Sequence, residues 1–290
     1  MTTIVMTGAT SGIGLVAATQ LIADGHHVIA GVRSPHELPG AELRPLDLSD
    51  LASVRAFAER CPAQIDVLVL NAGMQVHSAA KRSADGFELT FATNHLAHYL
   101  LARLLLPKLA AGGRIILTSS GTHDPAEKTG VPAPVHADAK RLADPETDPT
   151  LGKSAIAAGL RAYSSSKLCN LMTARSLAQA ADVTAKGITV HAYDPGFIPT
   201  TGLARNAPWI VRSVIMPVIG LLPLGKGTNT LSAGGRALAG LADGSIDGPQ
   251  VYMSLRGGLP TWPAPSVLAR DDALCQQLWT DSAAMVGLPA

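Results

Sequence analysis

A tyrosine and a lysine four residues apart form the most chemically distinctive pair in the sequence. Tyr163 and Lys167 lie in a segment with a helical pattern, so their side chains share one face, one turn apart. A free phenol has a pKa of about 10, and a neighbouring ammonium group favours the phenolate and lowers that pKa. Such a phenol can donate a proton to a carbonyl oxygen or accept one from an alcohol. The pair predicts acid–base chemistry, although a surface helix can also carry both residues by chance.

Three glycines near the start of the chain give a second chemical signal. Gly8, Gly12 and Gly14 follow a strand-like apolar run and open a helical segment. The first allows a sharp turn, the second allows the backbone to approach a pyrophosphate, and the third allows close packing of helix on strand. The helix N-terminus then offers free N–H groups to phosphates. This context predicts a dinucleotide site; an ordinary tight turn between strand and helix is the alternative.

Strand-length apolar runs alternate with helical patterns along the chain. Strands are expected at 4–7, 28–32, 42–46, 65–70, 114–119, 188–193 and 250–253, and helices at 12–23, 51–60, 87–109, 161–181 and 227–242. The alternation predicts an α/β fold with a single Rossmann-like, doubly wound parallel sheet and helices on both faces. Residues 1–290 are expected to form one dinucleotide-binding and catalytic domain, with a proline-rich insertion at 121–160 and a substrate-binding lid at 197–226.

The glycine spacing, Gly-x-x-x-Gly-x-Gly, resembles that of the short-chain dehydrogenase/reductase family rather than the Gly-x-Gly-x-x-Gly of other dinucleotide folds. Later motifs follow in the family's order: Asn71-Ala72-Gly73 after the fourth strand, Tyr163-x-x-x-Lys167 in a helix, and Pro195-Gly196 after the sixth strand. The resemblance implies an NAD(P)-dependent oxidoreductase that moves a hydride between nicotinamide and a carbonyl or alcohol. It also implies that oxidised nicotinamide assists Lys167 in lowering the pKa of Tyr163.

The resemblance further implies roles for individual residues. Ser120 would hydrogen-bond the substrate oxygen, with Ser119 as the alternative, and Asn94 would hold a proton-relay water near the lysine. The expected catalytic residues are Asn94, Ser120, Tyr163 and Lys167. The residues expected to bind the cofactor are Gly8, Thr10, Ser11, Gly12, Ile13, Gly14, Arg33, Asp47, Leu48, Asn71, Ala72, Gly73, Tyr163, Lys167, Pro195, Gly196, Ile198 and Thr200.

No metal site is expected. His95 and His98 are three residues apart on one expected helix, but no further cluster of ligands accompanies them. Packing in the core or at the surface accounts for both histidines.

The end of the second expected strand bears on the choice of nucleotide. It reads Ala30-Gly31-Val32-Arg33-Ser34 and holds no acidic residue to bind a ribose 2′-hydroxyl. Arg33 can instead pair with a 2′-phosphate, so NADP(H) is the expected cofactor. An exposed surface arginine is the alternative interpretation.

Two further stretches narrow the resemblance to one branch of the family. Thr93-Asn94-His95-Leu96-Ala97-His98 and Lys167-Leu168-Cys169-Asn170 resemble retinol-dehydrogenase-like enzymes and light-dependent protochlorophyllide reductase. Phe197 departs from the latter, which carries a cysteine after Pro-Gly.

The expected function is NADPH-dependent reduction of a bulky, apolar ketone or aldehyde. The alternatives are a retinol-like alcohol dehydrogenase working oxidatively, a C=C reductase similar to protochlorophyllide reductase, and a redox-sensing binding protein on the same fold. Intact Tyr163 and Lys167 argue against the last. The apolar segment 209–224 is interrupted by Arg212, Pro217 and Pro223 and is too short for a membrane span. It predicts a lid over a substrate pocket, with an oligomer interface or a membrane-contact element as the alternatives.

Charge and cysteine content bear on partners and location. The net charge of +1 indicates no nucleic-acid partner. Cys61, Cys169 and Cys275 are few and far apart, as is typical of unpaired thiols in a reducing compartment. Together with an N-terminus unlike a signal peptide, they predict a cytoplasmic protein that acts on a small molecule. The resemblance implies a homodimer or homotetramer, with the helix at 161–181 as a candidate interface.

Overall fold

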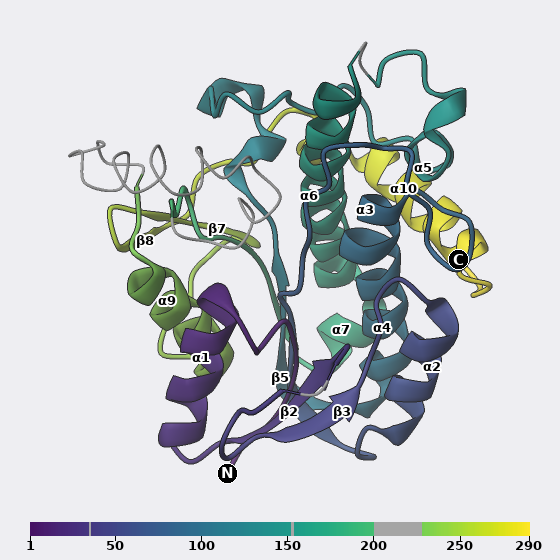
Figure 1. The fold of residues 1–290 in the computed structure, drawn as a ribbon. Coiled ribbons are helices and arrows are strands. Elements are labelled where there is room, and N and C mark those ends of the chain that lie inside the picture. The colour runs from purple at the N-terminus through teal and green to yellow at the C-terminus, as the bar shows by residue number, and fades with distance from the viewer. Residues whose placement is uncertain (35, 152–153, 200–227) are drawn as a thin grey trace.

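A single sheet runs through the centre of the protein, which is described here in a computed structural model over residues 1–34, 36–151, 154–199 and 228–290 (Figure 1). The order of its eight strands is β3-β2-β1-β4-β5-β6-β7-β8. All neighbours are parallel except β7 and β8. The strands are β1 (Thr3–Thr7), β2 (His27–Val32), β3 (Glu42–Pro45), β4 (Ile65–Leu70), β5 (Leu109–Thr118), β6 (Thr189–Asp194), β7 (Tyr252–Arg256) and β8 (Leu259–Thr261).

The direction of winding reverses between β1 and β4, which lie side by side although β2 and β3 separate them in sequence. In such sheets ligands bind at this switch point, beyond the carboxyl ends of the strands. The central strands are buried on both faces: Ile4, Val5 and Met6 have no exposed surface. This explains why they read as continuous aliphatic runs rather than alternating patterns.

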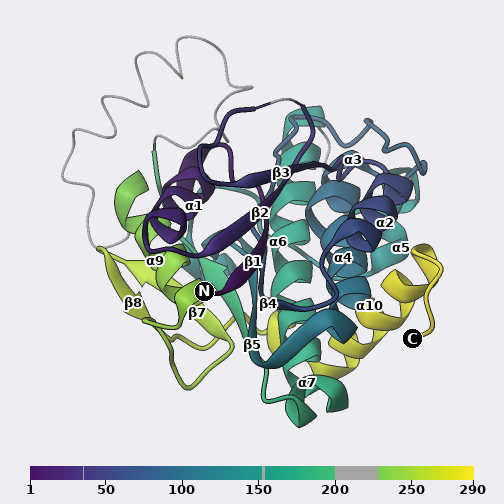
Figure 2. The ribbon, with the colours of Figure 1, turned by 90° about the horizontal axis from the view of Figure 1, so that it is seen from below.

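Helices cover both faces of the sheet (Figures 1 and 2). On one face, α1 (Gly12–Ala23) packs beside α9 (Leu231–Asp243). On the other face lie α2 (Leu51–Arg60), α4 (Ala97–Leu105) and α6 (Ala155–Gln179), and α10 (Asp272–Met285) packs on the outer side of α6. The short helices are α3 (Leu89–Phe91), α5 (Ala139–Ala143) and α7 (Ala181–Ala185). The doubly wound α/β fold predicted from the sequence is thereby confirmed.

The continuous helix predicted at 87–109 is wrong in detail. The chain forms α3, then one π-helical turn, η1 (Ala92–Leu96), then α4, and it ends in a 3₁₀ turn at Leu106–Lys108. In η1 the N–H of Ala97 donates to the carbonyl of Ala92, five residues back. A π turn bulges the helix locally and is common at functional positions. Here it contains Asn94.

Two elements begin earlier than the predicted starts, 114 for the strand and 161 for the helix, and two were not predicted. Strand β5 begins at Leu109 instead of Arg114, and its register with β4 shifts between Ile65 and Val67. Helix α6 begins at Ala155, where the Ser154 hydroxyl accepts a hydrogen bond from the N–H of Ala157. Strand β8 and helix α10 were not predicted. Helix α10 covers part of α6, the helix that the sequence indicates as an interface element.

Buried polar contacts order the segment predicted as an insertion, 121–160. The carboxylate of Asp148 accepts hydrogen bonds from Thr150, His136 (2.9 Å) and Arg141 (2.5 Å). Burial by itself would raise the pKa of Asp148, but these hydrogen bonds hold it well below its usual range. The assignments of an insertion and of a lid at 197–226 stay predictions, and residues 200–226 of the lid lie outside the described residues.

Within the described ranges, no helix combines the length and the apolar character needed to cross a membrane.

Candidate active site

The glycine loop after β1 fits the phosphates of a dinucleotide. Gly8 has a φ of +68°, and a Cβ there would lie 2.7 Å from the Cα of Ala72. Gly12 also has a positive φ, of +59°, but a Cβ there would meet nothing within 4 Å, so the loop is open at this point. The N-cap residue of α1, Ser11, makes no side-chain hydrogen bond to the helix. Free N–H groups at a helix N-terminus beside an open glycine loop are suited to bind an anion.

The turn after β4 is bound tightly to this loop. The backbone N–H groups of Asn71 and Ala72 both donate to the hydroxyl oxygen of Thr7, at 3.0 Å each. The Asn71 side chain donates to the carbonyl of Gly8 (3.1 Å) and accepts from the Thr118 hydroxyl (3.1 Å). The carboxyl ends of β1, β4 and β5 are therefore joined by side-chain hydrogen bonds at the switch point.

Tyr163 lies on α6, beside the carboxyl end of β5. The residue is buried, with 5% of its surface exposed. Burial raises the pKa of Tyr163 to about 12; a hydrogen bond with Ser120 opposes this shift, and the charge of Asp194 adds to it. The phenol is therefore protonated at neutral pH and touches Ser120, as a proton donor next to a hydrogen-bonding hydroxyl would.

Lys167 lies one turn along α6, and its ammonium group points back to the end of β5. Its Nζ donates to the carbonyl of Thr118 (2.9 Å) and lies 5.8 Å from the centre of the Tyr163 ring. Burial lowers the pKa of Lys167 to about 8, although the charge of Asp194 opposes the shift. A Cβ on Gly73 would come 3.3 Å from Nζ, so the ammonium lies directly against the turn after β4.

The prediction that Lys167, together with an oxidised nicotinamide, lowers the pKa of Tyr163 concerns the protein with its cofactor bound and stays a prediction. In the protein by itself, burial raises the pKa of the phenol, the hydrogen bond with Ser120 opposes this shift, and the charge of Asp194 adds to it. The protein's own groups thus favour the protonated phenol, which is the form that gives a proton to a carbonyl oxygen.

Asn94 joins the π turn to the active site. It is fully buried, and its side-chain oxygen accepts from the N–H of Met74 (2.8 Å). Its side-chain nitrogen donates to the carbonyl of Met74 (2.9 Å) and to the hydroxyl of Ser166 (3.0 Å). These bonds explain a polar residue in a buried helix, because every polar atom of the side chain has a partner. The water-relay role remains a prediction.

The two serines after β5 differ in their environment. The hydroxyl of Ser119 donates to the carbonyl of Lys167 (2.9 Å) and is buried. Ser120 is half-buried and shares a hydrogen bond with Tyr163. The geometry favours Ser120 as the residue that would meet a substrate oxygen, while Ser119 fixes α6 to the strand end.

The adenosine end of the predicted cofactor site lies after β2 and β3. Arg33 is exposed, and among the described residues its side chain has no partner. One carboxylate oxygen of Asp47 accepts from the N–H and the hydroxyl of Ser49. Leu48 packs against the core. Arg33 is thus free to pair with an anionic group at this edge of the sheet.

Beyond β6, a buried carboxylate shapes the turn at Pro195-Gly196. Asp194 has no exposed surface; it accepts from the N–H of Gly196 (2.9 Å), the hydroxyl of Ser254 (2.8 Å) and the phenol of Tyr252 (3.1 Å). This residue was not predicted from the sequence, although an acidic residue at the end of a buried strand, directly before Pro-Gly, is the signal that could have found it. The roles of Thr7 and Thr118 were not predicted either.

The remaining predicted cofactor residues lie around these turns. The side chains of Ile13 and Ile198 are buried, and a Cβ on Gly234 of α9 would meet both, at 3.0 and 2.7 Å. Thr10 is half-buried at the glycine loop. Thr200 lies outside the described residues.

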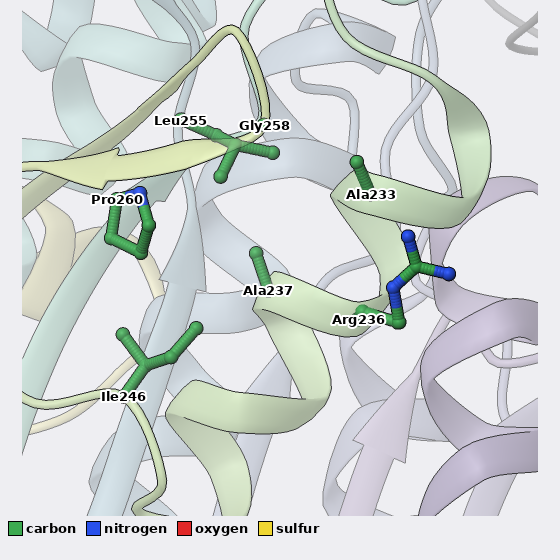
Figure 3. Close-up of a pocket in the computed structure, with 7 residues that line it drawn as sticks. All are labelled: Ala233, Arg236, Ala237, Ile246, Leu255, Gly258 and Pro260. Atoms are coloured by element: carbon green, nitrogen blue, oxygen red, sulfur yellow. The ribbon is translucent and has the colours of Figure 1, made fainter.

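A small pocket of about 150 Å³ lies away from these groups, between α9, β7 and β8 (Figure 3). Its lining includes none of the predicted site residues; it consists of Ala233, Arg236, Ala237, Ile246, Leu255, Gly258 and Pro260. The convergence of polar side chains at the switch point, and not this pocket, defines the candidate active site. In the part of the chain that the structure describes, no group of three His, Cys, Asp or Glu side chains is placed to hold a metal.

Comparisons with known proteins agree with this geometry. The family model for short chain dehydrogenases matches residues 2–131. Protochlorophyllide reductase of Chlamydomonas reinhardtii is 32% identical over 314 residues, which cover 99% of this chain and 78% of the relative. Dehydrogenase/reductase SDR family member 13 of Bos taurus is 32% identical over 307 residues, which cover 99% and 73%. The chain belongs to the short-chain dehydrogenase/reductase family.

Within that family, these relatives confirm the branch predicted from the sequence, which contains protochlorophyllide reductase and retinol-dehydrogenase-like enzymes. A crystal structure of an uncharacterized protein from Mycobacterium paratuberculosis is also similar along the whole chain. Its TM-score is 0.72 at 30% sequence identity, and the match covers 100% of this chain and 94% of that chain. The chain is thus an oxidoreductase whose family binds nicotinamide cofactors.

Proposed function

We propose that the protein is an NADPH-dependent carbonyl reductase that converts a bulky, apolar ketone or aldehyde into its alcohol. The observation that carries this proposal is the buried Tyr163 phenol, protonated at neutral pH, in contact with Ser120 and one turn from Lys167. A protonated phenol is the proton donor that reduction of a carbonyl needs.

Each residue has a separate role in the proposed reaction. Tyr163 donates its proton to the carbonyl oxygen of the substrate, and the Ser120 hydroxyl donates a hydrogen bond to the same oxygen. Lys167, whose pKa of about 8 keeps it largely charged at neutral pH, stabilises the phenolate left on Tyr163. A nicotinamide, when bound, supplies the hydride that adds to the carbonyl carbon. The glycine loop and the N-terminus of α1 would hold its pyrophosphate.

Arg33 supports the choice of NADPH. It is exposed just past β2, without a partner among the described residues, and no acidic side chain stands at 30–34. A guanidinium offers a planar, bidentate partner to a 2′-phosphate. A hydrogen bond to a charged group contributes about 1.5–3 kcal/mol net, which corresponds to about a 10- to 100-fold preference for NADPH.

The preference of the nucleotide site is measured by kcat/KM with each nucleotide. We expect Arg33→Ala to lower kcat/KM for NADPH by about 10- to 100-fold and to leave that for NADH nearly unchanged. Arg270→Ala, at an exposed arginine just before α10, is the control and should change neither. A wild type that prefers NADH would contradict the choice of nucleotide but not the reaction class.

A second candidate reaction is reduction of a C=C bond, because protochlorophyllide reductase is among the relatives. The two reactions separate in the same assay. Carbonyl reduction proceeds in darkness and consumes NADPH with ketones and aldehydes, whereas a light-driven C=C reductase requires illumination. Alcohol oxidation with NADP⁺ in the same panel gives the direction that the enzyme favours.

The experiment that tests the proposal is a panel of carbonyl compounds and alcohols, followed at the cofactor absorbance in darkness. We expect bulky, apolar carbonyls to be preferred, since the segment 209–224 is rich in aliphatic residues. Tyr163→Phe should lower kcat by about 100-fold or more, because it removes only the transferable proton. Tyr99→Phe removes a buried phenol hydroxyl elsewhere and should keep kcat. Near-normal turnover in Tyr163→Phe would refute the proposal.

The proposal also includes a cytoplasmic location and a homo-oligomeric state. Cys61, Cys169 and Cys275 are free and buried, which supports a cytoplasmic protein in a reducing environment. Sedimentation of the purified protein tests the homodimer or homotetramer that the resemblance implies.

A further inference from the structure

His98 is a buried histidine that contacts both Thr7, at the start of the glycine loop, and Asn94, in the π turn. It lies on α4, four residues after Asn94, and has no exposed surface. Its Nδ1 lies 2.9 Å from the carbonyl oxygen of Asn94 in the π turn. Its Nε2 lies 3.0 Å from the hydroxyl of Thr7, at the end of β1 and 91 residues away in sequence.

The contacts of His98 permit one arrangement of protons. The carbonyl of Asn94 can only accept, so the proton of the neutral imidazole is on Nδ1, and Nε2 carries a lone pair. The Thr7 hydroxyl therefore donates to Nε2. Its oxygen then accepts from the N–H groups of Asn71 and Ala72. One donor and two lone pairs are all used, so the direction of every bond at this hydroxyl is determined.

The charge state of His98 agrees with this arrangement. Burial lowers its pKa to about 4, and the nearby charge of Lys167 acts in the same direction, although the hydrogen bond with Asn94 opposes it. A proton on Nε2 would face a hydroxyl oxygen that already accepts two hydrogen bonds. The neutral imidazole is thus the form that fits at physiological pH.

We propose that His98 is a positioning residue for cofactor binding: by accepting from the Thr7 hydroxyl, it fixes the turn at Asn71 and Ala72 against the start of the glycine loop. The Asn71 side chain in turn fixes the position of the glycine loop, because it donates a hydrogen bond to the carbonyl of Gly8 (3.1 Å). The inference rests on the nicotinamide dinucleotide of the proposed function. It adds a residue that contacts neither cofactor nor substrate and acts through Thr7.

Two substitutions test the contacts of the two imidazole nitrogens separately. The side chain of His98→Asn places a donor near the position of Nδ1 but does not reach Thr7. The longer side chain of His98→Gln places an acceptor near the position of Nε2. Calorimetric titration of the purified proteins with NADPH and with NADH measures Kd for each variant, without turnover.

We expect His98→Asn to raise Kd about tenfold, equivalent to about 1.4 kcal/mol, and His98→Gln to keep Kd within about twofold of the wild type. The change should be equal for NADPH and NADH, because the network lies at the glycine loop and not at Arg33. A merely structural role would lower the melting temperature of both variants and leave Kd unchanged in both.

A pair of substitutions at Thr7 keeps the test decisive if the His98 variants do not fold. Thr7→Val removes the hydroxyl and should raise Kd about tenfold, while Thr7→Ser keeps the hydroxyl and should bind as the wild type does. Equal Kd values for His98→Asn and His98→Gln, or for Thr7→Val and Thr7→Ser, would overturn the proposal. A wild type that binds neither nucleotide would overturn the proposed function as well, so the two failures are distinguishable.

Discussion

Acidification should destabilise the protein through two buried histidines of the interrupted helix, His95 and His98. Burial and the neighbouring His98 lower the pKa of His95 to about 3, against a weaker opposing contact with Asn170. Burial likewise lowers that of His98 to about 4. Both imidazoles gain their usual pKa of about 6.5 when the chain unfolds. The unfolded state therefore binds more protons than the folded state between those values, and stability falls as the pH falls through that window.

The size of this effect follows from the two shifts. A pH of about 5 is about 1.5 units below the pKa of an unfolded histidine and still above both folded values. Each of the two histidines therefore lowers the free energy of unfolding by about 2 kcal/mol between about pH 7.5 and about pH 5. The pair together costs about 4 kcal/mol, a large part of the 5–15 kcal/mol that typically holds a domain folded. Urea unfolding at a series of pH values measures this loss as a change in the free energy of unfolding.

Substitution assigns the pH dependence to one of these residues. His95 packs against the rings of Phe91 and Tyr99 (centroids 5.0 and 6.1 Å apart), so a phenyl ring fits its surroundings. We expect His95→Phe to reduce the loss between about pH 7.5 and pH 5 by about 2 kcal/mol, and His36→Gln, at an exposed histidine, to leave the loss unchanged. A pH dependence in His95→Phe equal to that of the wild type would refute the reasoning.

Three other substitutions test the site and its support. Gly73→Ala places a Cβ 3.3 Å from Nζ of Lys167, so kcat should fall about tenfold while the circular dichroism spectrum stays unchanged. Asp194→Asn removes a negative charge that, after burial, raises the pKa of Tyr163; the loss of reductase activity at high pH should move to lower pH, and a move to higher pH would contradict this. Asp148→Asn should cost about 2 kcal/mol in urea unfolding, because charged hydrogen bonds are lost.

The parts of the fold that local patterns determine could be predicted from the sequence. Buried parallel strands are continuous aliphatic runs, and the helix at Gly12–Ala23 ends where it was expected. The π turn at Ala92–Leu96 could not be predicted, since its residues suit an ordinary helix and tertiary contacts of Asn94 accompany the change in hydrogen bonding. Helix α10 was missed because it has only a weak contrast between apolar and polar faces: Cys275, Leu278, Ser282 and Ala283 are its buried residues.

The same distinction, between features set by local sequence and features set by tertiary contacts, applies to the active site. Residues whose type and spacing carry the chemistry, such as Tyr163 and Lys167 one helical turn apart, could be named from the sequence, and the structure places them beside the carboxyl end of β5. The pKa of Tyr163 could not be predicted, because it depends on how much surrounding chain buries the phenol. The spacing along a helix predicts that a lysine lies near the phenol, but it does not predict how completely the fold removes water from around the phenol.

The polar contacts that join the strand ends were beyond sequence reasoning for a related reason. Thr7 and His98 are separated by 91 residues, and each has a simple local explanation, as a strand residue and as a helix residue. Only the sheet order, which places β1 beside β4, brings the hydroxyl, the imidazole and the turn at Asn71 together. In a doubly wound sheet, the residues that perform the chemistry are recognisable one motif at a time. The residues that hold those motifs in register are recognisable only after the strands have been placed.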